Sequence, residues 1–294
     1  MMMRRFIPLL CATLLAACAS APPQKPAVAA AAAAPTQRLA DDNLNAVAWT
    51  QTAIEHDLIL REIYRVAQEK LAAAVADRSW DALPHAERAT DPKNLPPAVI
   101  LDVDETVLDN SPYQARLIRD GGEYDEFSWA QWCKQADARA LPGAVAFTRY
   151  AAAHGVAVFY LSNRAKDLDT VTLANLRNAG FPVAGPDSFL GLGTFVKGCE
   201  QIGSEKGCRR RLIGARYRVL MQFGDQIGDF VDVLANTHAG RAAAVEPYAG
   251  WFGERWFVLP NPTYGSWEPA LFNNDWTLPR ARRDAAKRSA LRTD

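Results

Sequence analysis

The sequence of 294 residues has no excess of charge and little histidine or cysteine. Lysine and arginine together number 33, as do aspartate and glutamate, and there are four histidines and five cysteines. Without a net field, the chain has no general attraction for a nucleic-acid polymer or an anionic membrane surface, so any recognition of phosphate must be local. The hydrophobic fraction of 49% is enough for a large core and excludes a disordered protein.

The apolar run near the N-terminus is too short to span a bilayer. It covers residues 6–15 and follows Arg4 and Arg5, which is the arrangement of a secretory signal. We therefore expect the chain to be exported, which places its cysteines in an oxidising compartment.

Residues 15–18, Leu-Ala-Ala-Cys, resemble the lipobox of bacterial lipoproteins, in which the cysteine is lipidated and becomes the mature N-terminus. The alternative is an ordinary signal-peptidase site with an incidental cysteine, but Cys18 closes the apolar run at the position expected for lipidation. Residues 1–18 are thus predicted to be a lipoprotein signal peptide, and a lipid anchor on Cys18 would tether the protein without spanning the bilayer. In such lipoproteins aspartate after the cysteine retains the protein at the inner membrane, so Ala19 indicates the outer membrane of a bacterial envelope.

Two segments separate this anchor from the rest of the chain. Residues 19–40 are rich in alanine and proline and have almost no large apolar side chains, so they are predicted to be a tether. Within residues 41–91, apolar side chains recur at roughly helical spacing with charged residues between them. This pattern predicts one or two amphipathic helices that pack on the remainder of the protein.

Three cysteines lie beyond the anchor: Cys133, Cys199 and Cys208. An odd number in an oxidising compartment leaves at least one of them unpaired within the chain. Cys199 and Cys208 are close enough in sequence to close a small loop, but spacing alone does not show that their Cβ atoms meet. Their pairing is therefore left open.

An apolar run at residues 98–101 has the composition of a fully buried strand, and Asp102 and Asp104 follow it directly. Two further apolar runs also end in polar groups: residues 156–161 lead to Ser162, and residues 219–223 lead to Asp225 and Asp229. In open α/β sheets, ligands bind outside the carboxyl ends of the strands. The acidic residues therefore stand where chemistry is expected.

Predicted helices alternate with these strands, which indicates right-handed parallel crossovers. We expect residues 92–278 to form an α/β domain with a doubly wound, mostly parallel sheet, to which runs near residue 189 and over 256–259 are candidates for further strands. Residues 111–141 have no strand pattern and are rich in aromatic and acidic side chains, so they are predicted to be a smaller helical insertion, or cap, beside the site. The charged tail, residues 279–294, is expected to fray.

Four aspartates at one crevice would repel one another and raise each other's pKa values unless a cation neutralised them, so a divalent metal is expected. Oxygen ligands without histidine or thiolate suit Mg²⁺. A carboxylate can attack phosphorus to form an aspartyl phosphate, and Lys206 could offset the charge of the transferring group. Ser204 is a plausible N-cap for the helix on which Lys206 is predicted to lie.

Each of these features alone has an ordinary alternative. The strand end at Asp102 could be a capped turn, the pair Asp225 and Asp229 an Asx-turn into a helix, Ser162 a helix cap and Lys206 a solvated charge. Their order, strand placement and residue types agree, however, and this combination favours a phosphoryl-transfer site.

The chain resembles the haloacid dehalogenase (HAD) superfamily in four motifs. They are DxDET at residues 102–106, LSNR at 161–164, SxKxxR at 204–209 and GDxxxDF, which ends at Phe230. Additional similarities (VAWTQTAIEH, VLDNSPYQ, PGAVAF and NPTYGSWE) extend over residues 46–272 and point to the class C acid phosphatases. These are bacterial lipoprotein 5′-nucleotidases, also called the lipoprotein e(P4) family.

This resemblance implies a role for each motif residue. Asp102 would be the nucleophile and a metal ligand, and Asp104 the general acid and base, which binds metal through its backbone carbonyl. Ser162 and Lys206 would contact the phosphoryl group. The metal ligands implied for Mg²⁺ are Asp102, Asp104, Asp225 and Asp229.

Substrate contacts are implied for Asn163 and Arg164, and for Trp129 and Tyr264, which would sandwich a nucleobase or pyridine ring. The alternative for both aromatics is an ordinary place in the core. Trp129 and Trp132 share a helix face, which is also typical of core residues.

The chain departs from the family pattern around the lysine. Glu205, Gly207 and Cys208 surround Lys206, so a constrained loop could change its reach, and Lys197 is a competing candidate. Gln226 and Ile227 replace a more usual Asn-Leu pair, a change that we expect to be tolerated.

The sequence therefore predicts a Mg²⁺-dependent phosphomonoesterase that hydrolyses nucleoside 5′-monophosphates or related aromatic phosphates through an aspartyl phosphate. The alternative is a surface lipoprotein that binds haem or a nucleotide cofactor for uptake without turnover. That alternative requires the loss of a catalytic residue, and none is lost. Whether the protein forms a homodimer is left open.

Overall fold

The computed structural model describes residues 43–293. The expected signal peptide, Cys18 and the tether of residues 19–40 lie outside this range. Within it, none of the helices combines the length and the apolar character that crossing a membrane would require.

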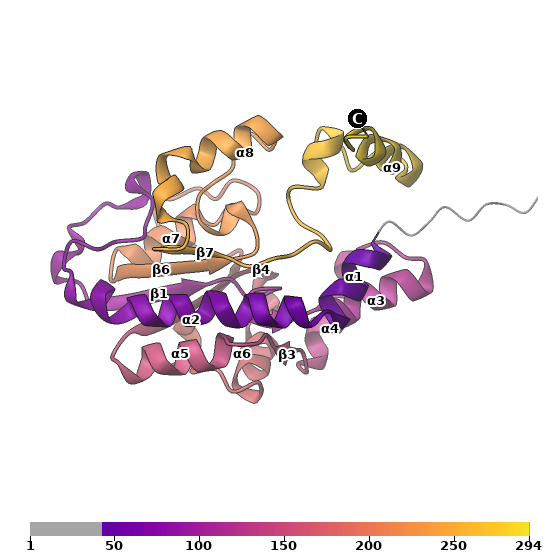
Figure 1. Ribbon diagram of the computed structural model, residues 1–294. Helices are drawn as coiled ribbons and strands as arrows, with labels where there is room; N and C mark the ends of the chain where they lie inside the picture. The colour runs from indigo at the N-terminus through magenta and orange to yellow at the C-terminus, as the bar shows by residue number, and fades with distance from the viewer. Residues whose placement is uncertain (1–42, 294) are drawn as a thin grey trace, which may run out of the picture. The chain divides into compact units, whose positions relative to one another are not determined.

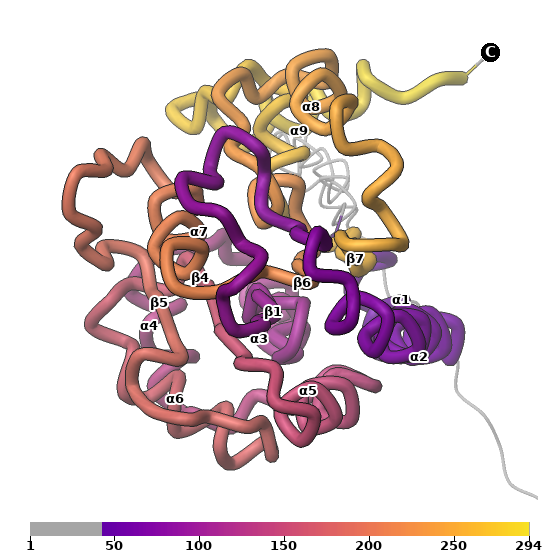
Figure 2. The backbone as a smooth tube through the Cα atoms, turned by 90° about the vertical axis from the view of Figure 1, so that its left-hand side faces the viewer, coloured from indigo at the N-terminus to yellow at the C-terminus, as the bar shows by residue number. Residues whose placement is uncertain are grey.

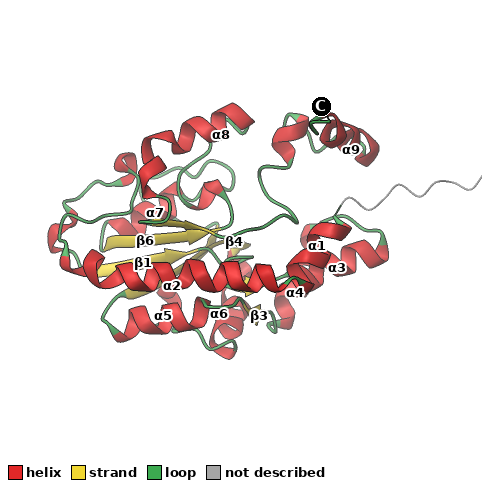
Figure 3. Cartoon of the chain, viewed as in Figure 1, coloured by secondary structure: helices red, strands yellow, loops and turns green. Residues whose placement is uncertain are grey.

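Five strands form one parallel sheet, in the order β5-β4-β1-β6-β7 (Figure 1). Their bounds are β1 (Pro97–Leu101), β4 (Ala157–Ala165), β5 (Phe189–Leu192), β6 (Arg218–Gly224) and β7 (Trp256–Val258). The predicted α/β class and parallel sheet are confirmed, and both shorter candidates form edge strands. Helices cover both faces of this sheet, as Figure 3 shows.

The central strand β1 is buried on both faces, which explains why its sequence is a continuous apolar run without alternation. Val99 and Leu101 pack in the larger core with α2 (Ile54–Ala76) and α5 (Ala144–Ala153). Ile100 packs on the opposite face with residues such as Trp256. Because both faces are covered, the strand has one register, and its carboxyl end is fixed.

The helices divide between the two faces of the sheet. Figure 2 shows α5 and α6 (Asp169–Asn178) on one side of the strands and α7 (Gly207–Gly214) and α8 (His238–Val245) on the other. The remaining N-terminal helix, α1 (Leu44–Thr52), packs against α3 (Ser111–Asp120). The chain before the sheet thus supplies two helices, α1 and α2, in the region where one or two were expected.

The segment predicted as a helical insertion contains α3 and α4 (Glu126–Gln135). It also contains a strand that was not predicted: β3 (Arg139–Ala140) pairs antiparallel with β2 (Leu108–Asp109). Strands of two residues leave no periodic pattern in a sequence, which is why this ribbon was missed.

Two local expectations are wrong. Helix α7 begins at Gly207 with Lys206 at its N-cap, so Ser204 is not the cap. The charged tail does not fray: residues 280–289 form helix α9 (Arg280–Ser289), whose Arg283 is buried. Tertiary ion pairs that a helical pattern does not reveal hold this helix.

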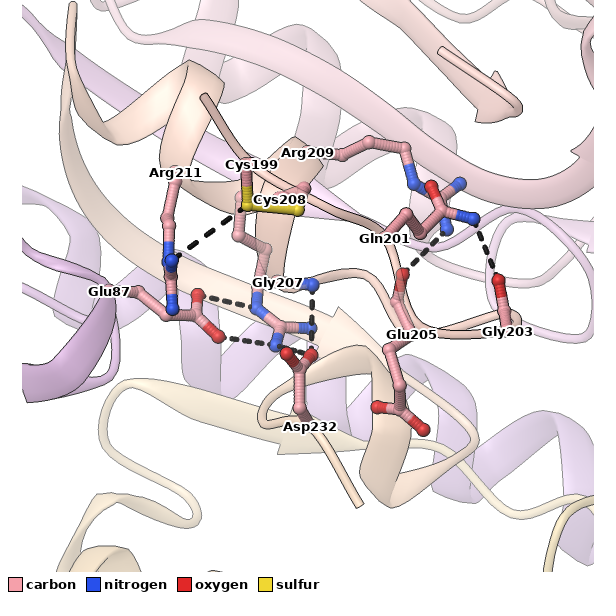
Figure 4. The surroundings of a disulfide bond; sticks show 11 residues. Glu87, Cys199, Gln201, Gly203, Glu205, Gly207, Cys208, Arg209, Arg211 and Asp232 are labelled. Carbon is pink, nitrogen blue, oxygen red and sulfur yellow. Dashed lines mark hydrogen bonds and ion pairs between the residues drawn. A yellow bond between two sulfur atoms is a disulfide. The ribbon is translucent and has the colours of Figure 1, made fainter. Parts of the chain in front are cut away.

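Cys199 and Cys208 form a disulfide with a Cα–Cα distance of 5.7 Å, and Cys133 is a free, buried thiol. The disulfide joins an exposed loop to the first turn of α7 (Figure 4). The pairing that the sequence left open is thus made.

Removing this disulfide by a Cys199→Ser/Cys208→Ser double substitution should lower the free energy of unfolding by about 2 to 3 kcal/mol, because the bond closes a short loop in the unfolded chain. Urea denaturation monitored by circular dichroism measures the change. As a control, reductant should lower the urea midpoint of the unsubstituted protein to that of the double variant and leave the variant unaffected. A midpoint that is insensitive to reductant would contradict the assignment.

Candidate active site

Polar side chains gather at the carboxyl-terminal ends of three neighbouring strands, β4, β1 and β6. Leu101 pairs with Tyr160 on one side and Phe223 on the other, so the three strands are level where β1 ends. Asp102 and Asp225 come directly after β1 and β6, and Ser162 lies beyond this level on β4. Together with Lys206, the aspartates line a cleft of about 1060 Å³, a size typical of a small-molecule site.

Three carboxylates form a cluster in this cleft. One oxygen each of Asp102, Asp225 and Asp229 lie within 4.8 Å of one another. Asp225 accepts hydrogen bonds from Gln226 Nε2 at 2.7 Å and Asn261 Nδ2 at 2.8 Å, which fix its carboxylate. Gly224 allows the close approach of Asp229, because a Cβ at that position would overlap the Asp229 side chain.

Two of the three carboxylates, Asp102 and Asp225, have raised pKa values because burial and nearby negative charge disfavour their ionised forms. Burial, and after it the charge of Asp229, raises the pKa of Asp225 to about 7. Burial also raises the pKa of Asp102 well above its ordinary value, and Asp229 and Asp225 add to the effect, whereas Lys206 opposes it. A divalent cation would offset this repulsion, and an all-carboxylate donor set suits a hard cation such as Mg²⁺.

Lys206 supplies one positive charge to the cluster. Its Nζ lies 2.5 Å from Asp102 Oδ1 and 2.8 Å from Asp229 Oδ1, and it donates to the carbonyl of Leu161 at 2.7 Å. Burial acts to lower the pKa of Lys206, but the two aspartates outweigh it and the pKa is raised. The lysine is therefore held as a cation. Lys197, the competing candidate, is exposed.

The loop that carries Lys206 is anchored on both sides of the residue. Gly207 N donates to Asp232 Oδ1 at 2.8 Å (Figure 4), and Glu205 accepts from the backbone N–H of Val233 at 2.8 Å. A Cβ at Gly207 would overlap the Asp232 carboxylate, so glycine is required here. The constrained loop that the sequence suggested thus directs the lysine to the site.

Asp104 has different surroundings from Asp102, although only one residue separates them. Ser162 Oγ donates to Asp104 Oδ2 at 3.0 Å, and Arg164 Nε and Asn110 Nδ2 each donate to Asp104 Oδ1 at 2.9 Å. These donors hold the Asp104 carboxylate apart from the three-carboxylate cluster. Asp102 and Asp104, which both follow β1, therefore lie in different environments.

Asn163 and Arg164, which were expected to contact substrate, both line the cleft but have different surroundings. Arg164 is 1% exposed. Its guanidinium donates to the Asp104 carboxylate and lies 5.6 Å from the centre of the Trp129 ring. Asn163 is exposed on the cleft wall, where its Oδ1 accepts from Arg209 at 2.7 Å. Arg164 is thus placed to position Asp104.

Trp129 and Tyr264 both line the cleft. Trp129 is 9% exposed and packs edge-on against Tyr113 with 5.2 Å between ring centroids, so it combines a core position with an edge at the site. Tyr264 is half-buried, and its hydroxyl donates to the Glu105 carboxylate. Trp132 belongs to the core and donates from Nε1 to Asn110 at 2.8 Å.

Sequence reasoning missed the role of Glu105. This buried residue has a φ of 56°, in the left-handed region, and its carboxylate accepts the backbone N–H of Asn110 at 2.7 Å as well as the Tyr264 hydroxyl. Burial, followed by the charges of Asp104 and Asp225, raises its pKa well above the ordinary value. The signal was its place inside the DxDET motif, directly after two functional aspartates.

Comparison with known proteins gives a consistent result. The sequence model of a family described as HAD superfamily, subfamily IIIB (acid phosphatase) matches residues 13–267. A crystal structure of the class C acid phosphatase from Bacillus anthracis is similar, with 32% identity and a TM-score of 0.74, over 86% of this chain and 97% of that one. A second structure of that phosphatase, with tungstate bound, is 33% identical with the same TM-score and coverage.

Curated plant proteins match a shorter region of the chain. A stem 31 kDa glycoprotein from Glycine max is 28% identical over 165 residues, which are 56% of this chain and 58% of the relative. Acid phosphatase 1 from Solanum lycopersicum is 28% identical over 165 residues, 56% of this chain and 57% of the relative. The match thus spans little more than half the length of these curated relatives.

The raised pKa of Asp225 predicts that the metal-free protein loses stability as the pH rises. The pKa is about 7 in the folded chain against a reference value of 3.8, so the folded state binds more protons between these values. The free energy of unfolding should therefore fall by about 2 to 4 kcal/mol from pH 4 to pH 7 on account of this residue.

Urea denaturation in chelator across this pH range measures the slope. Asp225→Asn should make it shallower, whereas Asp187→Asn, on an exposed residue, should not. Saturating Mg²⁺ should restore stability at pH 7. An unchanged slope in the Asp225 variant would contradict the electrostatic account.

Proposed function

The chain belongs to the acid phosphatases of HAD subfamily IIIB, and on that premise we propose that it is a Mg²⁺-dependent phosphomonoesterase that acts on nucleoside 5′-monophosphates or related aromatic phosphates. One observation carries the proposal: Asp102, Asp225, Asp229 and Lys206 converge at the carboxyl ends of parallel strands in a single cleft. The tungstate bound by the Bacillus anthracis phosphatase is a tetrahedral oxyanion, which agrees with a phosphoryl site.

The residues present fit a divalent cation. Asp102, Asp225 and Asp229 would hold it, and a backbone carbonyl at Asp104 is a further oxygen donor. When bound, the cation would neutralise charge on the phosphoryl oxygens and on the three carboxylates. Lys206 supplies one positive charge against three carboxylates, so the cluster keeps a net negative charge when all three are ionised. A divalent cation would cancel that charge.

The first chemical step is assigned to Asp102. Its carboxylate oxygen attacks phosphorus, a P–O bond to the aspartate forms, and the P–O bond to the leaving alcohol breaks. Asp104 gives a proton to the leaving oxygen, so the alcohol departs neutral. Lys206 offsets charge on the phosphoryl group. The Ser162 hydroxyl is fully buried and donates to Asp104, so it helps to orient the acid.

The second step regenerates the enzyme. Asp104, now a carboxylate, takes a proton from water, whose oxygen attacks the phosphorus of the aspartyl phosphate. The P–O bond to Asp102 breaks, and inorganic phosphate leaves. Arg164 keeps Asp104 oriented through both steps, because its guanidinium is buried and bound to the Asp104 carboxylate at 2.8 Å and 2.9 Å.

The aromatic side chains at the rim support an aromatic leaving group. Trp129 and Tyr264 both line the cleft, and Tyr264 is oriented by the bond from its hydroxyl to Glu105. Stacking of a nucleobase or pyridine ring on such side chains contributes about 1 to 3 kcal/mol. The same rim could hold a planar ligand without turnover, but the family match and the convergence of Asp102, Asp225, Asp229 and Lys206 in one cleft favour an enzyme.

We further propose that the phosphatase is a lipoprotein of the bacterial outer membrane, anchored by acyl chains on Cys18. The support is the sequence of residues 1–18 and the alanine- and proline-rich tether that follows. An envelope location would place the cleft where exogenous phosphomonoesters arrive, and it agrees with a disulfide in the folded domain.

Replacing the nucleophile tests the chemistry. Asp102→Asn should lower kcat by about a thousandfold or more, because an amide cannot form the aspartyl phosphate. Activity of the unsubstituted protein should disappear in chelator and return with Mg²⁺. Hydrolysis of adenosine 5′-monophosphate, followed by phosphate release, measures both. Asp187→Asn is the matched exposed control, and full activity in the Asp102 variant would refute the assignment.

Truncating the aromatic rim tests the substrate class. Tyr264→Ala should raise KM for nucleoside 5′-monophosphates about tenfold through lost stacking and leave KM for glycerol phosphate within about twofold. Tyr264→Phe, which keeps the ring, should stay close to the unsubstituted enzyme in KM. Equal losses on both substrates would show that the residue does not recognise the leaving group.

A further inference from the structure

The C-terminal segment lines the same cleft as the catalytic aspartates. Its side chains at the cleft include Trp276, Arg280, Arg283 and Lys287. The segment, residues 268–293, lies beyond the residues that the family model matches, which end at 267. Figure 1 shows its helix α9 set apart from the sheet and its covering helices.

An ion pair ties α9 to the insertion on one rim of the cleft. Arg283 bonds to Glu123, in the loop between α3 and α4, and its guanidinium lies 5.5 Å from the centre of the Trp276 ring. Lys287 Nζ lies 2.6 Å from Glu268 Oε1, so a second pair holds α9 to the first residue of its own segment. That segment continues directly from the rim that carries Tyr264, and it therefore bridges the two rims.

The helix has little apolar surface of its own. Its sequence, RARRDAAKRS, has alanine as its only apolar residue type, and Arg283 is its one buried residue. A helix of ten residues is marginal in isolation, so tertiary contacts must stabilise it. Both acidic partners are at least partly exposed: Glu123 by 53% and Glu268 by 20% of their side chains. Salt should therefore weaken these bridges.

We propose that residues 268–293 form a strap that closes the outer end of the cleft and limits the leaving group to the size of a mononucleotide. The inference rests on the proposed phosphatase function and adds a determinant of specificity to it. A free nucleoside 5′-monophosphate ends within the cleft, whereas the 5′-phosphate of an oligonucleotide is followed by further nucleotides that must pass between the rims. The strap blocks that passage.

The test compares two substrates with the same first nucleotide: a nucleoside 5′-monophosphate and a 5′-phosphorylated oligonucleotide. Truncation after Leu278 should raise kcat/KM for the oligonucleotide about tenfold or more and change kcat/KM for the mononucleotide by about threefold at most. Glu123→Gln, which removes one tie and leaves the helix sequence intact, should shift the ratio in the same direction. Glu62→Gln is the matched control, because Glu62 is an exposed glutamate that does not line the cleft.

Salt supplies a second measurement. At about 1 M salt, where the Debye length is about 3 Å, the full-length enzyme should gain oligonucleotide activity relative to mononucleotide activity. The truncated enzyme, which has no strap to release, should show no such change in the ratio. An unchanged ratio in the truncated and Glu123→Gln proteins, with mononucleotide activity retained, would overturn the strap.

Failure of the proposed function would be distinct, because the full-length protein would then hydrolyse neither substrate with Mg²⁺. In that case fluorescence anisotropy with a labelled 5′-phosphorylated oligonucleotide tests the strap by binding alone. The truncated chain should bind it about tenfold more tightly than the full-length chain. Equal binding would refute the strap without reference to turnover.

Discussion

The confinement of three carboxylates with one lysine is the interaction on which the rest of the structure depends. Asp102, Asp225 and Asp229 repel one another in a buried place, and Lys206 offsets only part of their charge. Such an arrangement is unfavourable without a cation and persists only because the surrounding fold fixes it. The doubly covered sheet fixes two of the strand ends, and the anchored loop before α7 fixes the lysine. This local loss of stability agrees with the divalent cation and the phosphoryl group that are proposed to bind here.

The second constraint is the difference in surroundings between Asp102 and Asp104, which follow the same strand. Asp102 faces the cluster and Lys206, whereas Asp104 is held by Ser162, Asn110 and Arg164. The two carboxylates thus lie in different environments one residue apart, which agrees with the different roles proposed for them. Because Arg164 also lies against Trp129, the orientation of the Asp104 carboxylate is linked to the aromatic rim.

Much of the sheet and the positions of the aspartates at its edge could be predicted from the sequence, because buried strands leave clear apolar runs in it. Strand β1 is an unbroken apolar run since both its faces are buried, and the acids at its end follow from the sheet's topology. Contacts between distant residues left no such pattern. The sequence shows Arg283 only as a charge in a polar tail, because its partner Glu123 is far away in the chain. It likewise gives no sign of the buried ion pair between Arg164 and Asp104. Glu105 owes its role to Tyr264, which lies 159 positions further along the chain.

The central claim is that Asp102 forms a covalent phosphoaspartate, and trapping that intermediate tests it most directly. Asp104→Asn should slow attack by water, and p-nitrophenyl phosphate needs little acid assistance because its leaving group is stable as an anion. Acid-quenched Asp104→Asn protein, digested and examined by mass spectrometry, should carry one phosphoryl group on the peptide that contains Asp102, and Asp102→Asn/Asp104→Asn protein should carry none. Phosphoryl groups on another peptide, or their persistence in the double variant, would contradict the account.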